Sequence, residues 1–401
     1  MRRACRCHRI TGRWPLSRSV SLAHSRALPL SGAMSDTRTT PLIQSLPAAV
    51  PFVGPEVQER LNGTRYAARL GANENAFGPS PRAIEAMQTA ASEIWKYADS
   101  SSYELRSAIA DRHVTTPENV VVGEGIDGLL GYLVRMMIAP SDAVVTSAGA
   151  YPTFNYHVAG YGGTLHKVSY HADHEDLPAL MSRAAETGAK LIYFANPDNP
   201  MGSWAGGTDV TAALDYLPEG CLLILDEAYV EFAPEGTAAP ISADDPRVIR
   251  MRTFSKAYGM AGGRVGYAIG ARPLIAEFEK IRNHFGMNRA AQAGALAAYH
   301  DTDWMDHIRR EVQTARATIA RIAGENGLTA LPSATNFVAI DCGRDGDFAR
   351  AVLAGLIQRG IFARMPFVAP QDRCIRISCG LPGDLERLAT ALPGALQDAG
   401  R

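Results

Sequence analysis

Short apolar runs alternate with amphipathic stretches between about residue 80 and residue 280. Apolar runs bounded by polar or turn residues are typical of buried strands, whereas apolar residues spaced three and four apart predict helices. The predicted buried strands are Asn119–Val122, Ala143–Thr146, Lys190–Phe194, Cys221–Leu225 and Val248–Thr253. A helix is predicted at Ile126–Met137. This alternation predicts an α/β domain built around a mainly parallel sheet.

A second alternation follows toward the C-terminus. The segment Trp304–Ala323 predicts a long amphipathic helix. The strand, helix, strand and helix predicted after it are Asn336–Ile340, Asp347–Arg359, Cys374–Ser378 and Gly383–Gln397. We therefore expect a large domain at 73–295 and a smaller α/β domain at 296–401, with a Pro-rich arm at 34–72 that joins the small domain.

Residues 1–33 differ in composition from the rest of the chain. They hold seven Arg but no Lys, Asp or Glu, which is the composition of an organelle transit peptide. However, they show no clear amphipathic period, and Met34 follows them directly. We therefore favour a disordered or non-native extension from an upstream start site over a transit peptide.

The remaining residues carry 33 basic and 41 acidic groups, a balance that disfavours a nucleic-acid or anionic-membrane partner. No apolar run reaches the ~18 to 20 residues that cross a bilayer. The six cysteines are scattered without a CxxC pair, so neither a disulfide framework nor a zinc site is indicated. We expect a cytoplasmic protein with no nucleic-acid, membrane or metal partner.

A glycine-rich segment, Gly123-Glu124-Gly125-Ile126-Asp127-Gly128, lies between a predicted strand and a predicted helix. Three interpretations stay open for it: a tight turn, a cup for a phosphate group, or a dinucleotide site. The dinucleotide site is the least favoured, because the next strand runs into Ser147-Ala148-Gly149 instead of an acidic residue.

Two further segments place polar groups at strand ends. Asp226 and Glu227 follow an apolar strand, but the chain contains no Gly-Lys pair, which excludes a P-loop triphosphatase. Lys256 is one of five lysines and lies in Thr253-Phe254-Ser255-Lys256, ahead of a glycine-rich bend that contains Arg264. A lysine is ordinarily a solvated surface charge, but these neighbours indicate a chemical role for Lys256.

The polar stretch His171-Ala172-Asp173-His174-Glu175-Asp176 offers candidate metal ligands. A solvated loop that caps a helix beginning near Asp176 is the favoured interpretation, because Asp is a preferred N-cap residue.

Three motifs in this order, Asn196–Gly202, Asp226–Tyr229 and Ser255–Gly266, resemble the signature of the class I/II pyridoxal-phosphate aminotransferases. The resemblance covers about four fifths of the chain. Its narrower likeness is to the histidinol-phosphate aminotransferase branch, on the segments around Asn75, Asn288, Arg364 and Arg376. It implies fold type I, with a large cofactor-binding domain around a mostly parallel sheet and a smaller α/β C-terminal domain.

The resemblance implies pyridoxal 5'-phosphate as the cofactor. Lys256 would bind it covalently and move a proton, and Asp226 would keep its ring nitrogen protonated. Tyr229 and Asn199 would hydrogen-bond its ring oxygen. The implied phosphate contacts are Gly125, Ile126, Asp127, Thr253, Ser255 and Arg264, the implied ring-stacking residue is Phe154, and Tyr97 would reach the cofactor phosphate of a partner in a homodimer.

The same resemblance implies a ping-pong transfer of an amino group between L-histidinol phosphate and 2-oxoglutarate. The implied substrate contacts are Arg376, Arg364 and Asn75, and two guanidinium groups suit a dianion. Three alternatives stay open. They are an aromatic amino acid aminotransferase in which Arg364 is a surface charge, a decarboxylase similar to threonine-phosphate decarboxylases, and a non-catalytic effector-binding domain.

Overall fold

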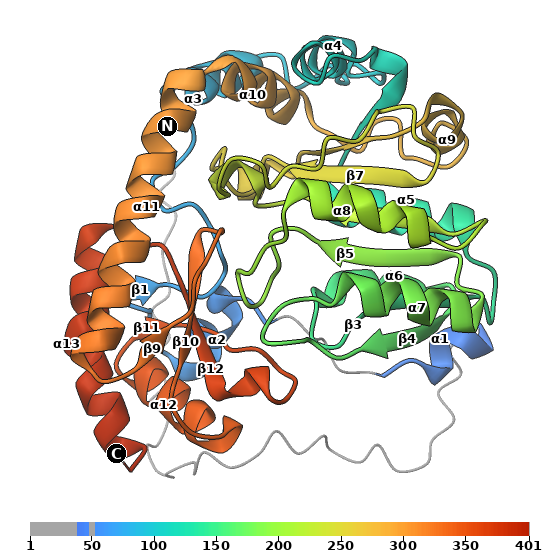
Figure 1. Cartoon of the computed structure of the whole chain (residues 1–401). Helices are drawn as coiled ribbons and strands as arrows, with labels where there is room; N and C mark the ends of the chain where they lie inside the picture. Colours follow the sequence, from blue (N-terminus) through green and yellow to red (C-terminus); the bar gives the residue numbers. More distant parts are fainter. Residues whose placement is uncertain (1–37, 48–52, 401) are drawn as a thin grey trace, which may run out of the picture. The chain divides into compact units, whose positions relative to one another are not determined.

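The computed structural model describes residues 38–47 and 53–400 (Figure 1). The chain divides into two units, residues 1–44 and 45–401. The short helix α1 (Pro41–Ser45) has no buried side chain. The predictions for residues 1–33 concern a segment outside the described residues.

A seven-stranded sheet with the order β2-β8-β7-β6-β5-β3-β4 organises the larger unit. Its strands are β2 (Val120–Gly123), β3 (Ala143–Ser147), β4 (Thr164–Val168), β5 (Leu191–Ala195), β6 (Leu222–Asp226), β7 (Val248–Thr253) and β8 (Gly266–Ile269). The pairs from β4 to β7 are parallel, and β8 is antiparallel to both β2 and β7. The predicted α/β fold with a mostly parallel sheet is therefore confirmed. The apolar pattern does not identify β4, a partly exposed edge strand, or the short β8.

Alternating side chains of the strands fill two separate cores. Leu222 and Ile224 pack with α5 and α6, whereas Leu223 and Leu225 pack with α7 and α8. Successive side chains of a strand point to opposite faces, so one continuous apolar run supplies both cores. The helices are α5 (Gly125–Met137), α6 (Pro152–Gly160), α7 (Leu177–Thr187), α8 (Gly207–Ala213) and α9 (Arg272–Phe278) (Figure 1).

The C-terminal part holds an antiparallel sheet of order β12-β10-β9 against which α11 and α12 pack. Its elements are α11 (Thr302–Glu325), β9 (Thr329–Ala330), β10 (Phe337–Asp341), α12 (Gly346–Gln358), β12 (Cys374–Ser378) and α13 (Pro382–Asp398). Strand β1 (Ala68–Arg69) pairs in parallel with β11 (Ile361–Phe362). The chain just before the large sheet therefore contacts the C-terminal part. The domain boundaries themselves stay predictions.

Among the described residues of the larger unit there are four more α-helices. They are α2 (Pro55–Asn62), α3 (Pro81–Ala91), α4 (Tyr103–Arg112) and α10 (Arg289–His300). Helix α10 packs on α3 and α4. Within the described residues, no helix is both long enough and apolar enough to cross a membrane.

Candidate active site

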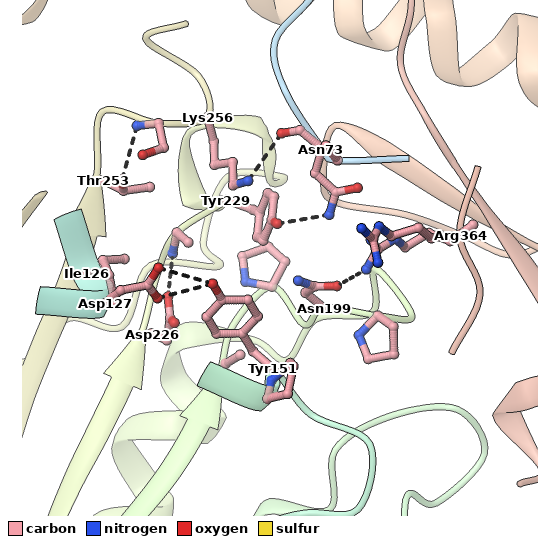
Figure 2. A pocket seen from close by; sticks show the side chains of 18 of the residues that line it. Asn73, Ile126, Asp127, Tyr151, Asn199, Asp226, Tyr229, Thr253, Lys256 and Arg364 are labelled. Atoms are coloured by element: carbon pink, nitrogen blue, oxygen red, sulfur yellow. Dashed lines mark hydrogen bonds between the residues drawn. The ribbon is translucent and has the colours of Figure 1, made fainter. Parts of the chain in front are cut away.

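A cavity of about 200 Å³ opens at the carboxyl ends of the sheet strands (Figure 2). Ala195, Asp226 and Thr253 end the adjacent strands β5, β6 and β7, and all three line it. Residues from the start of α5 and from the C-terminal part of the chain complete the wall. Ligands of parallel α/β sheets bind at the carboxyl ends of the strands, so this cavity is the candidate active site.

Lys256 enters the cavity from the loop after β7 (Figure 2). Its Nζ donates a hydrogen bond to the backbone oxygen of Asn73 at 3.2 Å and lies 5.6 Å from the centre of the Tyr229 ring. The Asn73 amide donates to the Tyr229 hydroxyl at 3.1 Å, and the Ser378 hydroxyl donates to Asn73 Oδ1 at 3.1 Å. The amine thus contacts a neutral carbonyl oxygen at a position fixed by several hydrogen bonds.

Asp226 places a buried carboxyl group on the wall, with 6% of its surface exposed. The Tyr193 hydroxyl donates to its Oδ2 at 2.6 Å, and the backbone N–H of Ala228 donates to its Oδ1 at 2.9 Å. Burial raises the pKa of Asp226 to about 6. A buried carboxylate held by neutral donors favours a cationic ligand group beside it.

The first turn of α5, the end of β7 with the loop after it, and the Arg264 side chain form a group that we call the anion cradle. It consists of Gly125, Ile126, Asp127, Thr253, Ser255 and Arg264. Arg264 Nη1 donates to Ser255 Oγ at 3.2 Å, and Arg264 Nη2 lies 3.6 Å from Asp127 Oδ2. Gly125 has a φ of +77°, and a Cβ there would lie 2.6 Å from Arg264 Nη2. No side chain caps α5, so its first backbone N–H groups and the guanidinium can both serve an anion.

Arg364 lies across the cavity from Asp127 and Asp226 (Figure 2), and Arg376 also lines the cavity. The Arg364 N–H donates to the Arg376 carbonyl at 3.3 Å and the reverse bond spans 2.6 Å, so the two residues lie side by side.

The two guanidinium groups contact neutral oxygens. Arg376 donates to the side-chain oxygen of Asn199 and, at 3.2 Å, to the Gly71 carbonyl, while Arg364 donates to the Val53 carbonyl at 2.6 Å. Burial lowers the pKa of Arg376 to about 10 and also lowers that of Arg364. Two desolvated cations at one wall favour an anionic ligand there.

The structure brings most of the predicted site residues to this one cavity. Those that line it are Ile126, Asp127, Asn199, Asp226, Tyr229, Thr253, Ser255, Lys256, Arg264, Arg364 and Arg376. Gly125 lies just behind them against Arg264. Phe154, Asn75 and Tyr97 lie elsewhere.

Phe154 is fully buried in α6 and stacks on Tyr193, with ring centroids 4.8 Å apart and planes 17° apart. The ring that this segment presents to the cavity is that of Tyr151, whose hydroxyl donates to Asp127 Oδ1 at 3.1 Å. Phe154 therefore supports a residue of the wall here, and its stacking on a cofactor stays a prediction.

Asn75 and Tyr97 lie outside the cavity wall. The Asn75 amide is buried and donates to the Ala257 carbonyl at 3.0 Å, which anchors the loop beside Lys256. Tyr97 is 79% exposed, and its ring centroid lies 4.7 Å from that of Phe285.

Tyr193 and Tyr151 were not predicted as site residues, and Asn73 lies in the segment around Asn75 without having been predicted as one. Tyr193 lies within an apolar strand, and its hydroxyl reaches Asp226 because Ala195 pairs with Asp226 in the parallel register of β5 and β6. A tyrosine two residues before the end of a buried strand indicates a hydrogen bond to the neighbouring strand only once the register of the two strands is known.

The polar stretch before α7 differs in part from its prediction. Asp176 Oδ1 accepts a hydrogen bond from the Ala179 N–H at 3.0 Å, so Asp176 caps the helix as predicted. The expectation of a solvated loop is wrong for Glu175, which is 9% exposed. The Ser147 hydroxyl and the Ala195 N–H satisfy its carboxyl group at 2.7 and 3.2 Å.

The fold and the wall residues together are those of a fold type I aminotransferase. The chain matches the model of the family Aminotransferase class I and II over residues 67–392 and belongs to that family. The predicted family, fold class and enzyme class are confirmed.

Individual relatives agree with this assignment. The chain is 37% identical, over 88% of its length and 97% of the relative's, to a histidinol-phosphate aminotransferase from Anaeromyxobacter sp. strain Fw109-5. It is 51% identical to the histidinol-phosphate aminotransferase from Sinorhizobium meliloti solved in complex with pyridoxal-5'-phosphate, with a TM-score of 0.88 and coverage of 91% and 99%. An aspartate aminotransferase mutant from Thermus thermophilus, 23% identical with a TM-score of 0.74 and coverage of 88% and 99%, shares the fold.

Proposed function

We propose that the chain transfers an amino group from L-histidinol phosphate to 2-oxoglutarate with pyridoxal 5'-phosphate as cofactor. The observation that carries this proposal is the pair of partly buried guanidinium groups, Arg364 and Arg376, which share one cavity with Lys256 and Asp226. The relative from Sinorhizobium meliloti, whose structure contains the cofactor, and the curated histidinol-phosphate aminotransferases support it.

The wall residues fit a pyridine ring that carries a phosphate. When bound, this cofactor supplies an aldehyde that takes up an amino group and a ring that absorbs electron density. The anion cradle would hold the phosphate, since a Cβ at Gly125 would collide with Arg264 where the two must approach. Asp226 would accept a hydrogen bond from the ring nitrogen, and Tyr229 and Asn199 would donate to the ring oxygen.

Lys256 would bind the cofactor and carry the proton of the transfer step. Its amine hydrogen-bonds to the neutral Asn73 carbonyl, so no carboxylate competes with the substrate for it at that contact. A lysine amine on a flexible stem can take a proton from the substrate α-carbon and return it at a second atom. Tyr229 lines the same cavity as Lys256.

The two arginines would divide the anionic groups of the substrates. Arg376 would bind an α-carboxylate, and Arg364 the distal carboxylate of glutamate or 2-oxoglutarate. A single phosphate of L-histidinol phosphate would lie between both guanidinium groups. In the structure the Asn75 amide donates to the Ala257 carbonyl, so the substrate contact of Asn75 stays a prediction from the resemblance alone.

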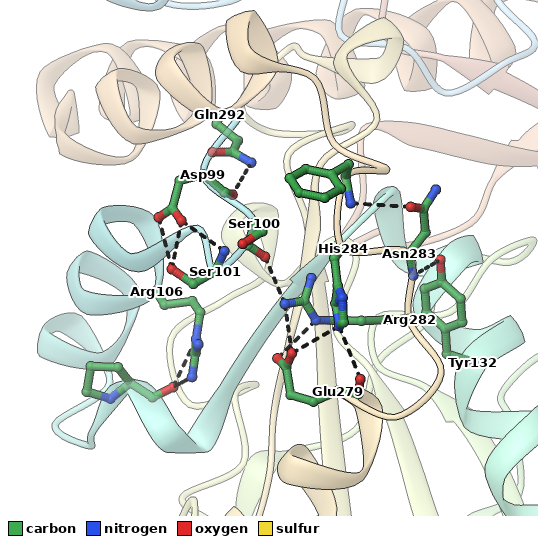
Figure 3. Close-up of polar contacts among 12 residues, drawn as sticks. Asp99, Ser100, Ser101, Arg106, Tyr132, Glu279, Arg282, Asn283, His284 and Gln292 are labelled. Carbon is green, nitrogen blue, oxygen red and sulfur yellow. Dashed lines mark hydrogen bonds and ion pairs between the residues drawn. The ribbon is translucent and has the colours of Figure 1, made fainter. Parts of the chain in front are cut away.

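A homodimer would cover an exposed aromatic surface beside the predicted partner contact. Trp95 and Tyr97 are each 79% exposed and Phe285 is 53% exposed. In the segment after Tyr97, Arg282 donates to the Ser100 carbonyl at 2.8 Å (Figure 3). An exposed apolar surface beside this segment fits an isologous two-fold contact. Fully active monomers at nanomolar dilution would contradict the dimer.

The cytoplasmic location and the lack of nucleic-acid, membrane and metal partners stay predictions from composition. The described cysteines, Cys221, Cys342, Cys374 and Cys379, are all free and buried.

A half-reaction screen tests the proposed function. The cofactor-loaded enzyme is mixed with a single amine, and the absorbance of the bound cofactor is followed without any acceptor. L-Histidinol phosphate and L-glutamate should convert the cofactor to its aminated form faster than L-phenylalanine or L-tyrosine. A faster reaction with the aromatic amino acids would favour an aromatic aminotransferase, and loss of carbon dioxide would favour a decarboxylase.

A further inference from the structure

Two buried carboxyl groups lie behind the cavity wall. Glu175 precedes α7 and is 9% exposed, and Asp198 lies in the loop after β5 and is 1% exposed. Their side chains are hydrogen-bonded to each other. The aminotransferase chemistry proposed above uses neither of them.

A hydrogen bond between two carboxyl groups requires that one of them keeps its proton. Burial raises the pKa of Glu175 well above its ordinary value, and the charge of Asp198 raises it further. Burial also raises the pKa of Asp198, to about 6, and its hydrogen-bond donors and the positive charge of Arg376 oppose that shift. Glu175 is therefore the partner that keeps its proton, and Asp198 is the one that ionises first.

Glu175 joins two strand ends to this pair. Its Oε2 accepts a hydrogen bond from the Ser147 hydroxyl at the end of β3 at 2.7 Å. Its Oε1 accepts from the Ala195 N–H at the end of β5 at 3.2 Å. The pair is thus fixed to the same sheet edge that forms the floor of the cavity.

Asp198 shapes the loop that carries Asn199. Its Oδ2 accepts from the Met201 N–H at 2.9 Å, and its Oδ1 accepts from the Tyr170 hydroxyl at 2.9 Å. Asn199 lies inside the turn closed by the Met201 contact, and its side-chain oxygen accepts from Arg376.

The charge of Asp198 also acts on Arg376 directly. It raises the pKa of the guanidinium, against the effect of burial. The hydrogen bonds of Arg376 nevertheless go to the neutral oxygens of Asn199 and Gly71. A counter-charge behind the loop supports the cation without a direct ion pair, so it does not displace an anionic substrate group.

We propose that Glu175 and Asp198 share one proton and act as a positioning pair that holds Asn199 and Arg376 ready for a substrate carboxylate. This inference rests on the proposed function, because the carboxylate is that of glutamate or 2-oxoglutarate. When both carboxyl groups ionise, their repulsion separates the loop from the sheet edge, and the carboxylate site is lost.

Variants of Glu175 separate positioning from packing. In the cofactor-loaded enzyme, Glu175→Ala should raise the KM for L-glutamate about tenfold or more, with a smaller change in kcat, because the loop loses its anchor. Glu175→Gln should restore a KM within about threefold of wild type, since its amide donates to Asp198 as the acid does. Asp176→Asn, which alters the neighbouring helix cap, should leave this KM unchanged.

A pH measurement gives a readout that a merely structural role does not move. A carboxyl group with a raised pKa keeps a proton in the folded chain that the unfolded chain has lost, so wild type loses stability as the pH rises above the ordinary glutamate pKa of 4.5. Glu175→Gln, measured on the full chain with and without cofactor, should reduce this slope by up to about one proton. Asp176→Asn should keep the wild-type slope.

Two results would overturn the positioning pair. They are a wild-type slope in Glu175→Gln, or a wild-type KM in a folded Glu175→Ala. If Glu175→Ala does not fold, the Glu175→Gln slope still decides the question. An inactive wild-type enzyme toward L-glutamate and L-histidinol phosphate would instead refute the proposed function, and the slope would remain a test of the shared proton.

Discussion

The cavity has a sheet wall, formed by Ala195, Asp226 and Thr253, and an arginine wall, formed by Arg364 and Arg376. On the sheet wall, the side-chain donor to Asp226 is Tyr193, 33 positions away along the chain. On the arginine wall, Arg376 reaches Asn199 over 177 positions, and Arg364 reaches Val53 over 311 positions. The first wall follows from one strand pair, whereas the second exists only after the C-terminal part has packed against the large sheet.

Burial acts in opposite directions on the two walls. It raises the pKa of Asp226 to about 6 and lowers that of Arg376 to about 10. A ligand group of the opposite charge therefore stabilises the charged residue on each wall. A ligand with a cationic ring nitrogen at one end and an anionic group at the other satisfies both walls together, as the cofactor and substrate of the proposed reaction do.

The largest effect should come from Lys256, which lies between the walls. Lys256→Ala should lower transamination on the order of 10⁴-fold or more, because it removes both the covalent attachment and the proton carrier. Borohydride reduction of the loaded enzyme followed by peptide mapping should label Lys256. Lys280→Ala, at a residue whose exposed side chain pairs with Glu277 at 2.6 Å, should behave as wild type. Label on Lys280 or another lysine would reject the assignment.

The contrast between the walls also explains what the sequence could predict. Asp226, Thr253 and Lys256 follow apolar strands, so a local pattern places them at one sheet edge. Arg364 stands in an ordinary apolar segment, and only its pairing with Arg376 brings it to the cavity. The resemblance to a family, not the local pattern, named it.

The buried polar residues behind the cavity wall were the least predictable from sequence. Tyr193 depends on the register of two strands. Glu175 looks solvated in a stretch of polar residues, yet the ends of β3 and β5 bury it. A polar residue reveals its burial only when its tertiary donors are known.

The next effect should be on the arginine wall. Arg364→Ala should reduce kcat/KM for L-histidinol phosphate by about 2 to 4 kcal/mol, or roughly 30-fold to 10³-fold, because the phosphate loses a partly buried cation. Phenylalanine and tyrosine should barely respond. Arg364→Lys keeps the positive charge but not the planar guanidinium group. Its kcat/KM for L-histidinol phosphate should lie between those of wild type and Arg364→Ala. An equal loss of kcat/KM for phosphorylated and aromatic amines would show that Arg364 does not select for an anionic substrate.

A substitution of Asp226 on the sheet wall should change the free energy of unfolding. Asp226 has a folded pKa of about 6 against an ordinary 3.8. Its protonated form is therefore favoured in the folded chain, and the chain loses stability as the pH rises through these values. Asp226→Asn, which resembles the protonated acid, should raise the free energy of unfolding of the cofactor-free chain by up to about 3 kcal/mol at pH 7 to 8, with little gain near pH 4.

Denaturant unfolding at several pH values measures this difference. The same variant should lose most of its transamination activity, because the counter-charge of the ring nitrogen is gone. A stability gain that is equal at all pH values would show that the buried charge is not its cause.

The smallest effect should come from Tyr193, which changes the pKa of Asp226 on the sheet wall and makes no contact with the arginine wall. Its hydroxyl donates to Asp226 Oδ2 at 2.6 Å and lowers the pKa of that carboxyl group. Tyr193→Phe keeps the ring that stacks on Phe154, so it removes the hydrogen bond and spares the packing. The pKa of Asp226 should then rise by ~1 unit.

This shift should appear in the pH dependence of cofactor affinity. Under the proposed role of Asp226, its carboxylate binds the ring nitrogen, so affinity should fall as the pH drops through the pKa of Asp226. In Tyr193→Phe this fall should begin at a higher pH than in wild type. Tyr151→Phe removes a cavity hydroxyl that donates to Asp127 instead, at 3.1 Å, and should leave the midpoint in place. An equal shift in both variants would mean that loss of any cavity hydroxyl has this effect. A shift confined to Tyr193→Phe would assign the tuning of the sheet wall to the single hydrogen bond between β5 and β6.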